Sequence, residues 1–117
     1  MVVKEAIAVA HYIDATGHLP GNYITKIDAK RAGWTGGSVE KIIPGKKIGG
    51  DYYFNRNNRL PAGTYHECDI GNTLKNRGPC RLVYSTSGRY YLTTDHYRTF
   101  SEIILNPELF MTYRACP

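Results

Sequence analysis

Tyr65-His66-Glu67-Cys68-Asp69-Ile70 is the first of three closely spaced runs that are rich in β-branched and aromatic residues. The other two are Arg81-Leu82-Val83-Tyr84-Ser85 and Tyr90-Tyr91-Leu92-Thr93-Thr94. Runs of this length and composition are typical of β-strands. Between the last two runs, Ser87-Gly88 is a turn signal that favours a hairpin. The three runs therefore predict consecutive antiparallel strands.

The chain on either side extends this sheet. Residues 48–54 are predicted to form a strand before the three runs, joined to them by the polar loop 55–63. The Gly49-Gly50 pair in that strand is typical of a bulge or of a close approach between backbones. Residues 99–105 offer a fifth strand after the three runs.

The first part of the chain has helical spacing instead. Apolar residues recur at the interval of one helix face over residues 3–15, and Gly17 follows as a stop signal. Thr25 is placed to cap a second helix over residues 26–32, and Ser38 is placed to cap a short turn that ends at Ile42. Helices followed by antiparallel strands indicate an α+β fold, with two to three N-terminal helices packed on a C-terminal antiparallel β-sheet.

Length and charge limit what this chain can be. A chain of 117 residues is one domain and can fold around its own core. Fifteen Lys and Arg against ten Asp and Glu leave a net charge of +5, which favours nucleic acid, an acidic protein or a membrane surface as partner. No apolar run reaches the roughly 20 residues of a membrane helix. The charged start Met1-Val2-Val3-Lys4-Glu5 is unlike a signal peptide, so we expect a cytosolic protein, a mature exported one, or a domain of a longer chain.

The cysteines and the tail leave alternatives open. Cys68, Cys80 and Cys116 match no zinc-binding spacing. An exported protein would hold one disulfide and one thiol, and a reducing compartment three thiols. If Cys116 pairs, Cys80 is the better partner, because Cys68 lies in mid-strand beside Glu67. After the break at Pro107, residues 108–114 are expected to form a short helical turn that lies back on the body of the domain.

A carboxylate, two arginines and a histidine stand at the heads or ends of the strand-like runs: Glu67, Arg77, Arg81 and His96. This set can bind a phosphodiester and move protons on both sides of it, provided that one cleft gathers all four. Each residue taken alone has an ordinary explanation, such as a solvated strand carboxylate or a surface histidine. The fold around them therefore decides the interpretation.

Four blocks of the sequence resemble the microbial guanyl-specific ribonuclease family of the barnase type, in the family's order. The blocks are Leu19-Pro20-Gly21-Asn22-Tyr23-Ile24-Thr25-Lys26, Ala32-Gly33-Trp34, Pro44-Gly45-Lys46-Lys47-Ile48-Gly49-Gly50-Asp51 and Thr93-Thr94-Asp95-His96-Tyr97-Arg98-Thr99-Phe100. The resemblance covers residues 1–104 and implies a ribonuclease domain there. Residues 105–117 are then a C-terminal extension that packs on the same domain.

The resemblance implies roles for individual residues. It assigns catalysis to Glu67 as general base, to His96 as general acid, and to Arg77, Arg81 and Lys26 as cations that bind phosphate and stabilise the anionic transition state. It assigns substrate binding to Asn55, Arg56, Asn57 and Tyr97. It assigns structural support to Asp51 and Asp69, of which Asp69 holds the two arginines in place. It implies no metal and no other cofactor.

Asn57 departs from the family pattern, because this position matches a glutamate that reads the edge of guanine. A carboxylate accepts two N–H bonds, whereas an amide offers one acceptor and one donor. Losing such a charge-assisted pair costs about 1.5–3 kcal/mol. The sequence therefore leaves the base preference open.

The resemblance also implies a biological setting. It points to a metal-independent endoribonuclease that cuts single-stranded RNA through a 2′,3′-cyclic phosphate, acting as a monomeric bacterial toxin that is secreted or delivered into target cells. Its partners would be RNA and an acidic, barstar-like inhibitor protein. Two alternatives stay open: a catalytically weak module on the same fold that binds RNA or the inhibitor, and a metal-dependent or DNA-directed nuclease.

Overall fold

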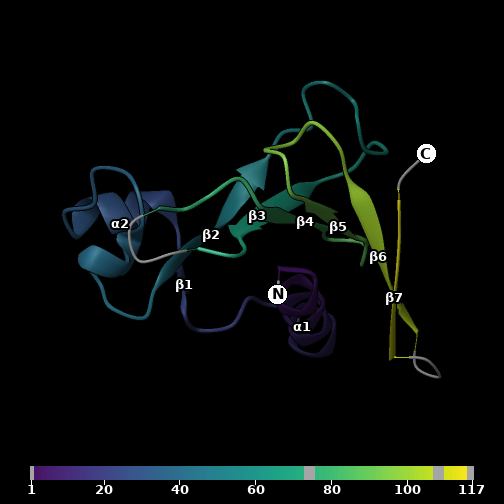
Figure 1. The fold of residues 1–117 in the computed structure, drawn as a ribbon, viewed down its shortest axis with the longest axis horizontal. Coiled ribbons are helices and arrows are strands. Elements are labelled where there is room, and N and C mark those ends of the chain that lie inside the picture. Colours follow the sequence, from purple (N-terminus) through teal and green to yellow (C-terminus); the bar gives the residue numbers. More distant parts are fainter. Residues whose placement is uncertain (1, 73–75, 107–109, 116–117) are drawn as a thin grey trace.

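A helix and a sheet make up most of the molecule. The computed structural model describes residues 2–72, 76–106 and 110–115. Within these residues α1 (Val2–Thr16) lies against one face of a seven-stranded sheet, and α2 (Lys26–Arg31) lies at the edge where the sheet begins (Figure 1). A single 3-10 turn, η1 (Val39–Lys41), follows α2. The α+β fold is confirmed. Among the described helices, none is long and apolar enough to cross a bilayer.

The strands lie in the sheet in the order of the sequence. They are β1 (Tyr23–Ile24), β2 (Lys47–Tyr53), β3 (Tyr65–Asp69), β4 (Arg81–Ser85), β5 (Tyr90–Thr93), β6 (Ser101–Asn106) and β7 (Phe110–Ala115). Each neighbouring pair from β2 to β7 is antiparallel. The five predicted strands are confirmed, with ends that differ by no more than two residues from those expected.

Two segments differ from the prediction. β1 is parallel to β2, with Tyr23 opposite Lys47; a strand of two residues is too short to show an alternating pattern in the sequence. The helical turn expected over residues 108–114 is wrong, because residues 110–115 form β7 and pair antiparallel with β6. Strand formation depends strongly on an available partner, and the free edge of β6 supplies one.

The C-terminal predictions fall partly outside the described residues. β6 runs through the expected boundary at residue 104, and the division into a domain of residues 1–104 and an extension of residues 105–117 stays a prediction. Cys68 and Cys80 are free thiols in the part of the chain that the structure describes. Cys116, the partner expected for Cys80, lies outside that part.

The main apolar core lies between α1 and the sheet. The buried residues of α1 recur at intervals of three and four, which places them on one face of the helix: Ala6, Val9, Ala10 and Ile13. They pack on buried residues from β3 to β6, among them Cys68, Leu82, Leu92 and Ile103. Because side chains alternate along a strand, His66 and Cys68 lie on this α1 face, whereas Tyr65, Glu67 and Asp69 lie on the opposite face.

Two smaller clusters complete the packing. On the face opposite α1, a compact apolar patch is formed by Leu60, Tyr65, Val83, Tyr91 and Phe100. At the β1 edge, Ala29, Trp34, Val39 and Ile48 join α2 and η1 to β2. The predicted caps are present as well, since Thr25 accepts a hydrogen bond from the backbone of α2 and Ser38 from that of η1.

The Gly49-Gly50 pair in β2 has the geometry that the sequence predicts. A Cβ atom on Gly49 would lie 2.5 Å from Cδ1 of Tyr23 and 2.7 Å from Cβ of Cys68, so only glycine fits there. The register with β3 shifts after Gly49, and Gly50 has a φ of +99°. A shifted register with a glycine at positive φ is a β-bulge, and it bends β2 next to the site described below.

Candidate active site

One cleft, on the face of the sheet opposite α1, gathers all nine residues predicted to act on or bind a substrate. Its volume is about 370 Å³. The nine residues come from the first turn of α2, from β3 and β4, and from the loops that follow β2, precede β4 and follow β5: Lys26, Asn55, Arg56, Asn57, Glu67, Arg77, Arg81, His96 and Tyr97. The fold therefore brings together the set that the sequence left scattered.

Glu67 lies in the middle of β3, between Asp51 of β2 and Val83 of β4. Its Oε1 accepts a hydrogen bond from the hydroxyl of Tyr97. Burial raises the pKa of the Glu67 carboxyl, and this effect exceeds the lowering by Tyr97 and by the nearby cations, of which Lys26 is the largest. A carboxylate with a raised pKa is a stronger proton acceptor, as a general base requires.

Asp69 is buried at the end of β3 and contacts both arginines. Arg77 donates from Nε to Oδ2 at 2.7 Å and from Nη2 to Oδ1 at 2.9 Å, a bidentate pair that raises the pKa of Arg77. Nε of Arg81 lies 3.1 Å from Oδ1 as an ion pair, without the alignment of a hydrogen bond. Nη1 of Arg81 donates to the backbone oxygens of Gly78 and Cys80, at 2.8 Å each. One carboxylate between two guanidiniums leaves net positive charge at the cleft.

Asp51 supports the position of Lys26. Its Oδ2 accepts a hydrogen bond from the backbone N of Lys26 at 3.1 Å, where α2 begins. A carboxylate at this end of a helix accepts a hydrogen bond from a free N–H group and interacts favourably with the positive end of the helix dipole. The bulge in β2 lies immediately before Asp51, so the same local distortion that bends the strand aims this carboxylate at α2. Lys26 is thereby held at the rim of the cleft.

Asp95 shapes the loop after β5. Its Oδ2 accepts from Oγ1 of Thr99 at 2.6 Å, and its Oδ1 accepts from the backbone N of Thr99 at 2.9 Å and from Oγ1 of Thr93 at 3.0 Å. These bonds, the Thr99 hydroxyl first, lower the pKa of Asp95 to about 2. His96 and Tyr97 follow with φ values of +55° and +75°, a region that side chains other than glycine rarely adopt. The Asp95 turn holds both residues in this costly conformation.

Tyr97 contacts both of the groups predicted to move protons. Its hydroxyl bonds to Glu67, and its ring lies edge-on to the imidazole of His96, with centroids 4.6 Å apart. The ring also stacks on Tyr53 at 5.3 Å. His96 is exposed at the cleft, and its backbone N donates to the oxygen of Pro79 at 3.1 Å. This bond ties the loop after β5 to the loop that leads into β4.

The loop after β2 gives its three predicted residues different positions. Asn55 is buried, and its amide is engaged by Leu60: Oδ1 accepts from the backbone N at 3.1 Å, and Nδ2 donates to the backbone O at 2.9 Å. The side chain of Asn55 therefore holds the shape of the loop, and only the backbone of Asn55 is available to contact a substrate. Arg56 and Asn57 are exposed at the cleft, and the guanidinium of Arg56 lies 5.6 Å over the ring of Phe54.

Three aromatic residues line the cleft that sequence reasoning did not assign to it: Tyr52, Tyr53 and Phe54. Phe54 is 70% exposed and Tyr52 60% exposed, so neither is in the core. The sequence feature that could have indicated them is the run of three consecutive aromatic residues in a predicted strand. Because side chains alternate between the two faces of a strand, at least one of the three must point away from the main core. Exposed aromatic rings next to cations suit the stacking of unpaired nucleobases.

The charged groups of the cleft suit an anion better than a cation. Lys26, Arg56, Arg77 and Arg81 all line it, and among the described residues Glu67 is the one carboxylate that does so. Within the described residues, no group of three or more His, Cys, Asp or Glu side chains is arranged to hold a metal ion. The geometry thus provides a proton acceptor, an imidazole and fixed cations around a space for a phosphate.

Comparison with known proteins identifies the family to which the chain belongs. The family model described as ribonuclease matches residues 6–104. The chain is 43% identical over 107 residues to a ribonuclease from Heyndrickxia coagulans, a match that covers 87% of this chain and 98% of the relative. It is also 43% identical over 107 residues to ribonucleases from Bacillus intermedius and Bacillus pumilus, covering 66% of each. The chain belongs to the ribonuclease family that its four sequence blocks resemble.

Proposed function

We propose that this ribonuclease is a metal-independent endoribonuclease that cuts single-stranded RNA by transphosphorylation. The observation that supports this most directly is that one cleft gathers Glu67, His96 and the cations Lys26, Arg77 and Arg81. The carboxylate with a raised pKa is the group that accepts a proton, and the imidazole is the group that donates one.

In the proposed reaction, the Glu67 carboxylate takes the proton of a ribose 2′-OH. The 2′-oxygen forms a bond to the adjacent phosphorus while the bond from phosphorus to the 5′-oxygen breaks. His96, protonated, gives its proton to the leaving 5′-oxygen. The products are a 2′,3′-cyclic phosphate and a new 5′-OH end, and slow hydrolysis of the cyclic phosphate reverses the two roles. Since DNA has no 2′-OH, it is bound at most and not cut.

The cations of the cleft stabilise the charge that builds on the non-bridging oxygens. Asp69 holds Arg77 in a fixed bidentate pair and lies beside Arg81, so neither guanidinium has to reorganise during the reaction. Lys26 contributes a further charge from the start of α2, where a cation is unfavourable for the helix itself. A functional reason for a lysine at this position follows from its place in the cleft.

Base choice is set by the loop after β2 and differs from a strict guanine preference. Asn57 is exposed at the cleft with an amide where the family has a carboxylate, so one of two charge-assisted bonds to a guanine edge is lost. Stacking on Phe54 and Tyr53 is tolerant of base identity. The protein on this proposal cuts after guanine with a weaker preference than the resemblance implies.

The proposed setting is a secreted or delivered bacterial toxin whose producer holds an acidic, barstar-like inhibitor. The net charge of +5 and the cations around the cleft support an anionic protein partner as well as RNA. Such an inhibitor would cover the groups that hold phosphate. Mixing the protein with a candidate inhibitor and measuring both binding and RNA cleavage tests this, and binding that leaves cleavage unchanged contradicts it.

The experiment that tests the activity compares the unmodified protein with Glu67→Gln, an isosteric change that removes the proton acceptor. The variant is expected to cut RNA about 10²–10⁴-fold more slowly. Glu40→Gln is the matched control outside the cleft, where Oε2 of Glu40 accepts from the backbone of Gly45. Assays include a chelator and a single-stranded DNA of the same sequence.

Each outcome of this comparison has a meaning. Equal cleavage by Glu67→Gln and the unmodified protein contradicts the mechanism, and activity lost in the chelator indicates a metal-dependent nuclease. Cleavage of the DNA contradicts the role of the 2′-OH. RNA that binds but is recovered whole supports the alternative, a catalytically weak module that binds RNA or the inhibitor.

A further inference from the structure

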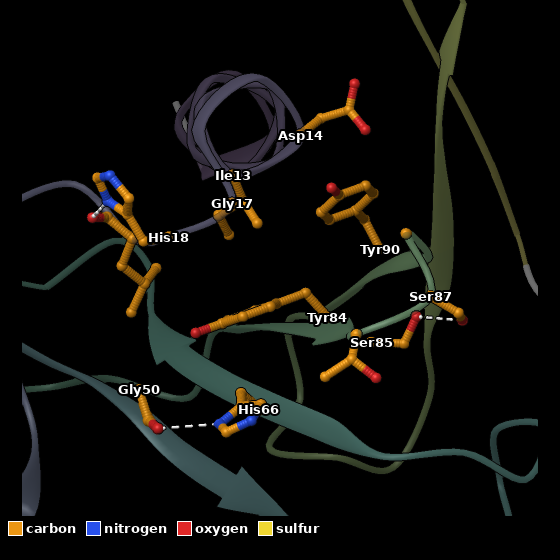
Figure 2. Close-up of a pocket in the computed structure, with 13 residues that line it drawn as sticks. Ile13, Asp14, Gly17, His18, Gly50, His66, Tyr84, Ser85, Ser87 and Tyr90 are labelled. Atoms are coloured by element: carbon orange, nitrogen blue, oxygen red, sulfur yellow. Dashed lines mark hydrogen bonds between the residues drawn. The ribbon is translucent and has the colours of Figure 1, made fainter.

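A second cavity lies on the other face of the sheet, between the C-terminal end of α1 and strands β2 to β5 (Figure 2). Its volume is about 600 Å³, within the range of natural sites for small ligands. Among the described residues, its lining and that of the catalytic cleft have no member in common. The mechanism proposed above leaves this cavity without a role.

The shape of the cavity suits a flat ligand. The ring of Tyr84 lies across the space, with Ile13 and Gly17 at the end of α1 facing it (Figure 2). Gly17 ends the helix with a φ of +80°, and a Cβ atom placed on it would meet nothing within 4 Å. A planar ring inserted here would stack on Tyr84 and lie against the helix end. Base–aromatic stacking of this kind is the usual way in which proteins hold unpaired nucleobases.

The polar groups of the cavity comprise acceptors and also hydroxyl groups that can donate or accept, those of Tyr84, Ser85, Thr86, Ser87 and Tyr90. Nδ1 of His66 donates to the oxygen of Gly50 at 3.0 Å, and Nδ1 of His18 donates to the oxygen of Leu19 at 2.9 Å. In the neutral rings, Nε2 is therefore an acceptor. The carboxylate of Asp14 lies at the rim beside Tyr90 (Figure 2).

Acceptors and hydroxyl groups around a flat slot suit a ligand whose own edge carries both donors and acceptors. A nucleobase provides amino and imino donors beside carbonyl and ring-nitrogen acceptors. Asp14 is negatively charged and disfavours a phosphate inside the cavity. The chemistry thus selects the base of a nucleotide and leaves its phosphate outside.

A column of aromatic rings connects the two sites. The centroids of Phe54 and Tyr52 are 6.2 Å apart, those of Tyr52 and His66 are 4.5 Å apart, and those of His66 and Tyr84 are 5.9 Å apart. The register explains the column, because Tyr52, His66 and Tyr84 are directly opposite one another on β2, β3 and β4. Phe54 and Tyr52 line the catalytic cleft, whereas His66 and Tyr84 line the second cavity.

The column ends at an accessible edge of the sheet. In the described part of the chain, β1 pairs only with Lys47 and Ile48, so the remainder of β2 has no strand on that side. Tyr52 is 60% exposed there and Phe54 is 70% exposed. A flexible single strand that lies in the cleft at Phe54 and Tyr52 can therefore reach this edge and continue past it toward His66 and Tyr84.

We propose that the second cavity is a nucleobase site, occupied by a base of the same RNA strand whose scissile phosphate lies in the catalytic cleft. This inference rests on the proposed function, because it requires RNA in the cleft. The net charge of +5 attracts the phosphates of a longer strand, including those that lie on the surface outside the cleft. The cavity would make the protein prefer longer RNA over the shortest substrates.

The kinetic test measures kcat/KM on a dinucleotide and on an RNA of eight nucleotides with the same central sequence. His66→Ala and Asp14→Ala each remove one wall of the cavity, and neither residue lines the cleft. Each is expected to lower the ratio of long to short kcat/KM about tenfold, the effect of losing one stacked or bonded base. His11→Ala and Asp28→Ala, at exposed helix positions, are the matched controls and should leave the ratio unchanged. A ratio that is also unchanged in both cavity variants overturns the inference.

A binding test separates this inference from the proposed function. An eight-residue DNA of the same sequence lacks the 2′-OH, and NMR can follow the signals of His66, Tyr84 and His96 as it is added. Shifts at His66 and Tyr84 with the octamer but not with a dinucleotide support the inference, even if no RNA is cut. Shifts at His96 alone overturn it. A free nucleoside that moves His66 and Tyr84 at lower concentration than the octamer would show that a free nucleotide, not the strand, is the occupant.

Discussion

Tyr97 donates a hydrogen bond from its hydroxyl to Oε1 of Glu67, so the residue next to the proposed acid is bonded to the proposed base. The bond stabilises the charged form of Glu67 and lowers the pKa of its carboxyl, against the larger raising effect of burial. Burial and the same bond raise the pKa of Tyr97, which keeps its proton and remains a donor. The pair therefore sets the pH at which Glu67 becomes able to accept a proton.

Replacing Tyr97 by phenylalanine should move the acid limb of the pH–rate profile to higher pH. Without the hydroxyl, Glu67 loses a bond to its charged form, and its pKa rises further. Since only the deprotonated carboxylate acts as a base, the rise of kcat/KM with pH begins later. The measurement is kcat/KM on an RNA dinucleotide across the acid limb.

The control for this prediction is Tyr12→Phe, which removes a hydroxyl from an exposed ring on α1. Its acid limb should coincide with that of the unmodified protein. An acid limb for Tyr97→Phe that stays in place, or moves to lower pH, would show that the bond does not control the titration of the base.

Asp69→Asn should destabilise the protein strongly. Asp69 is 1% exposed and contacts both Arg77 and Arg81, so an amide would leave two guanidiniums facing a neutral group that also carries donors. Removing one partner of a buried ion pair costs about 3–5 kcal/mol. Urea denaturation measures the change in the free energy of unfolding.

Asp28→Asn is the matched control, because the ion pair of Asp28 with Arg31 is exposed at 3.6 Å. Exposed pairs contribute about 0–1 kcal/mol. If both substitutions lower the free energy of unfolding by the same amount, the buried network around Asp69 is not what holds the arginines.

Asp95 should make stability fall at low pH. The hydrogen bonds from Thr99 and Thr93 lower the pKa of Asp95 to about 2 from an ordinary value of 3.8. A carboxyl whose pKa is lower in the folded protein than in the unfolded chain stabilises the fold. This contribution is complete above the pKa of the unfolded chain, and it is lost as the pH falls through the pKa of the folded protein. Between about pH 4 and pH 2, the Tm of Asp95→Asn should therefore decrease less steeply than that of the unmodified protein.

Thr99→Val tests the same point without removing the carboxylate. It deletes the hydroxyl at 2.6 Å, which is the first cause of the lowered pKa, so the pKa of Asp95 in the folded protein should rise toward its ordinary value. The acid-dependent loss of stability should then be smaller and be complete at a higher pH. Calorimetric Tm values at a series of pH values measure both variants. Parallel curves for all three proteins would show that the Asp95 turn contributes nothing to stability in this range.

The sequence predicted the strands from β2 to β6 because each has its own run of β-branched or aromatic residues. β1 and β7 escaped prediction for different physical reasons. β1 is two residues long and has no period to detect. β7 contains Phe110, Thr112 and Tyr113, residue types that favour strands, and it forms where the edge of β6 offers a partner. Sequence patterns predict local structure, but they do not show whether a neighbouring strand has a free edge for pairing.

The members of the candidate site were predicted, but not how they are held. The resemblance pointed to Asn55, yet nothing in the sequence shows that its amide is engaged by Leu60. Likewise, the positive φ of His96 and Tyr97 follows from bonds that Asp95 makes within the loop. Such geometry depends on contacts that form only in the folded chain.

Restoring the family carboxylate should restore a strict base preference. Asn57 lies exposed at the cleft, so Asn57→Glu adds two acceptors for the guanine edge without disturbing the core. A gain of about 1.5–3 kcal/mol corresponds to a rise of about 10- to 150-fold in kcat/KM after guanine relative to adenine. The measurement is the 3′-terminal base of fragments from an RNA of mixed sequence. Asn22→Glu makes the same charge change at an exposed turn outside the cleft and should slow cleavage after all bases alike. If the terminal bases of Asn57→Glu fragments match those of the unmodified protein, residue 57 does not read the base, and the preference depends on the stacking surface of Tyr53 and Phe54 instead.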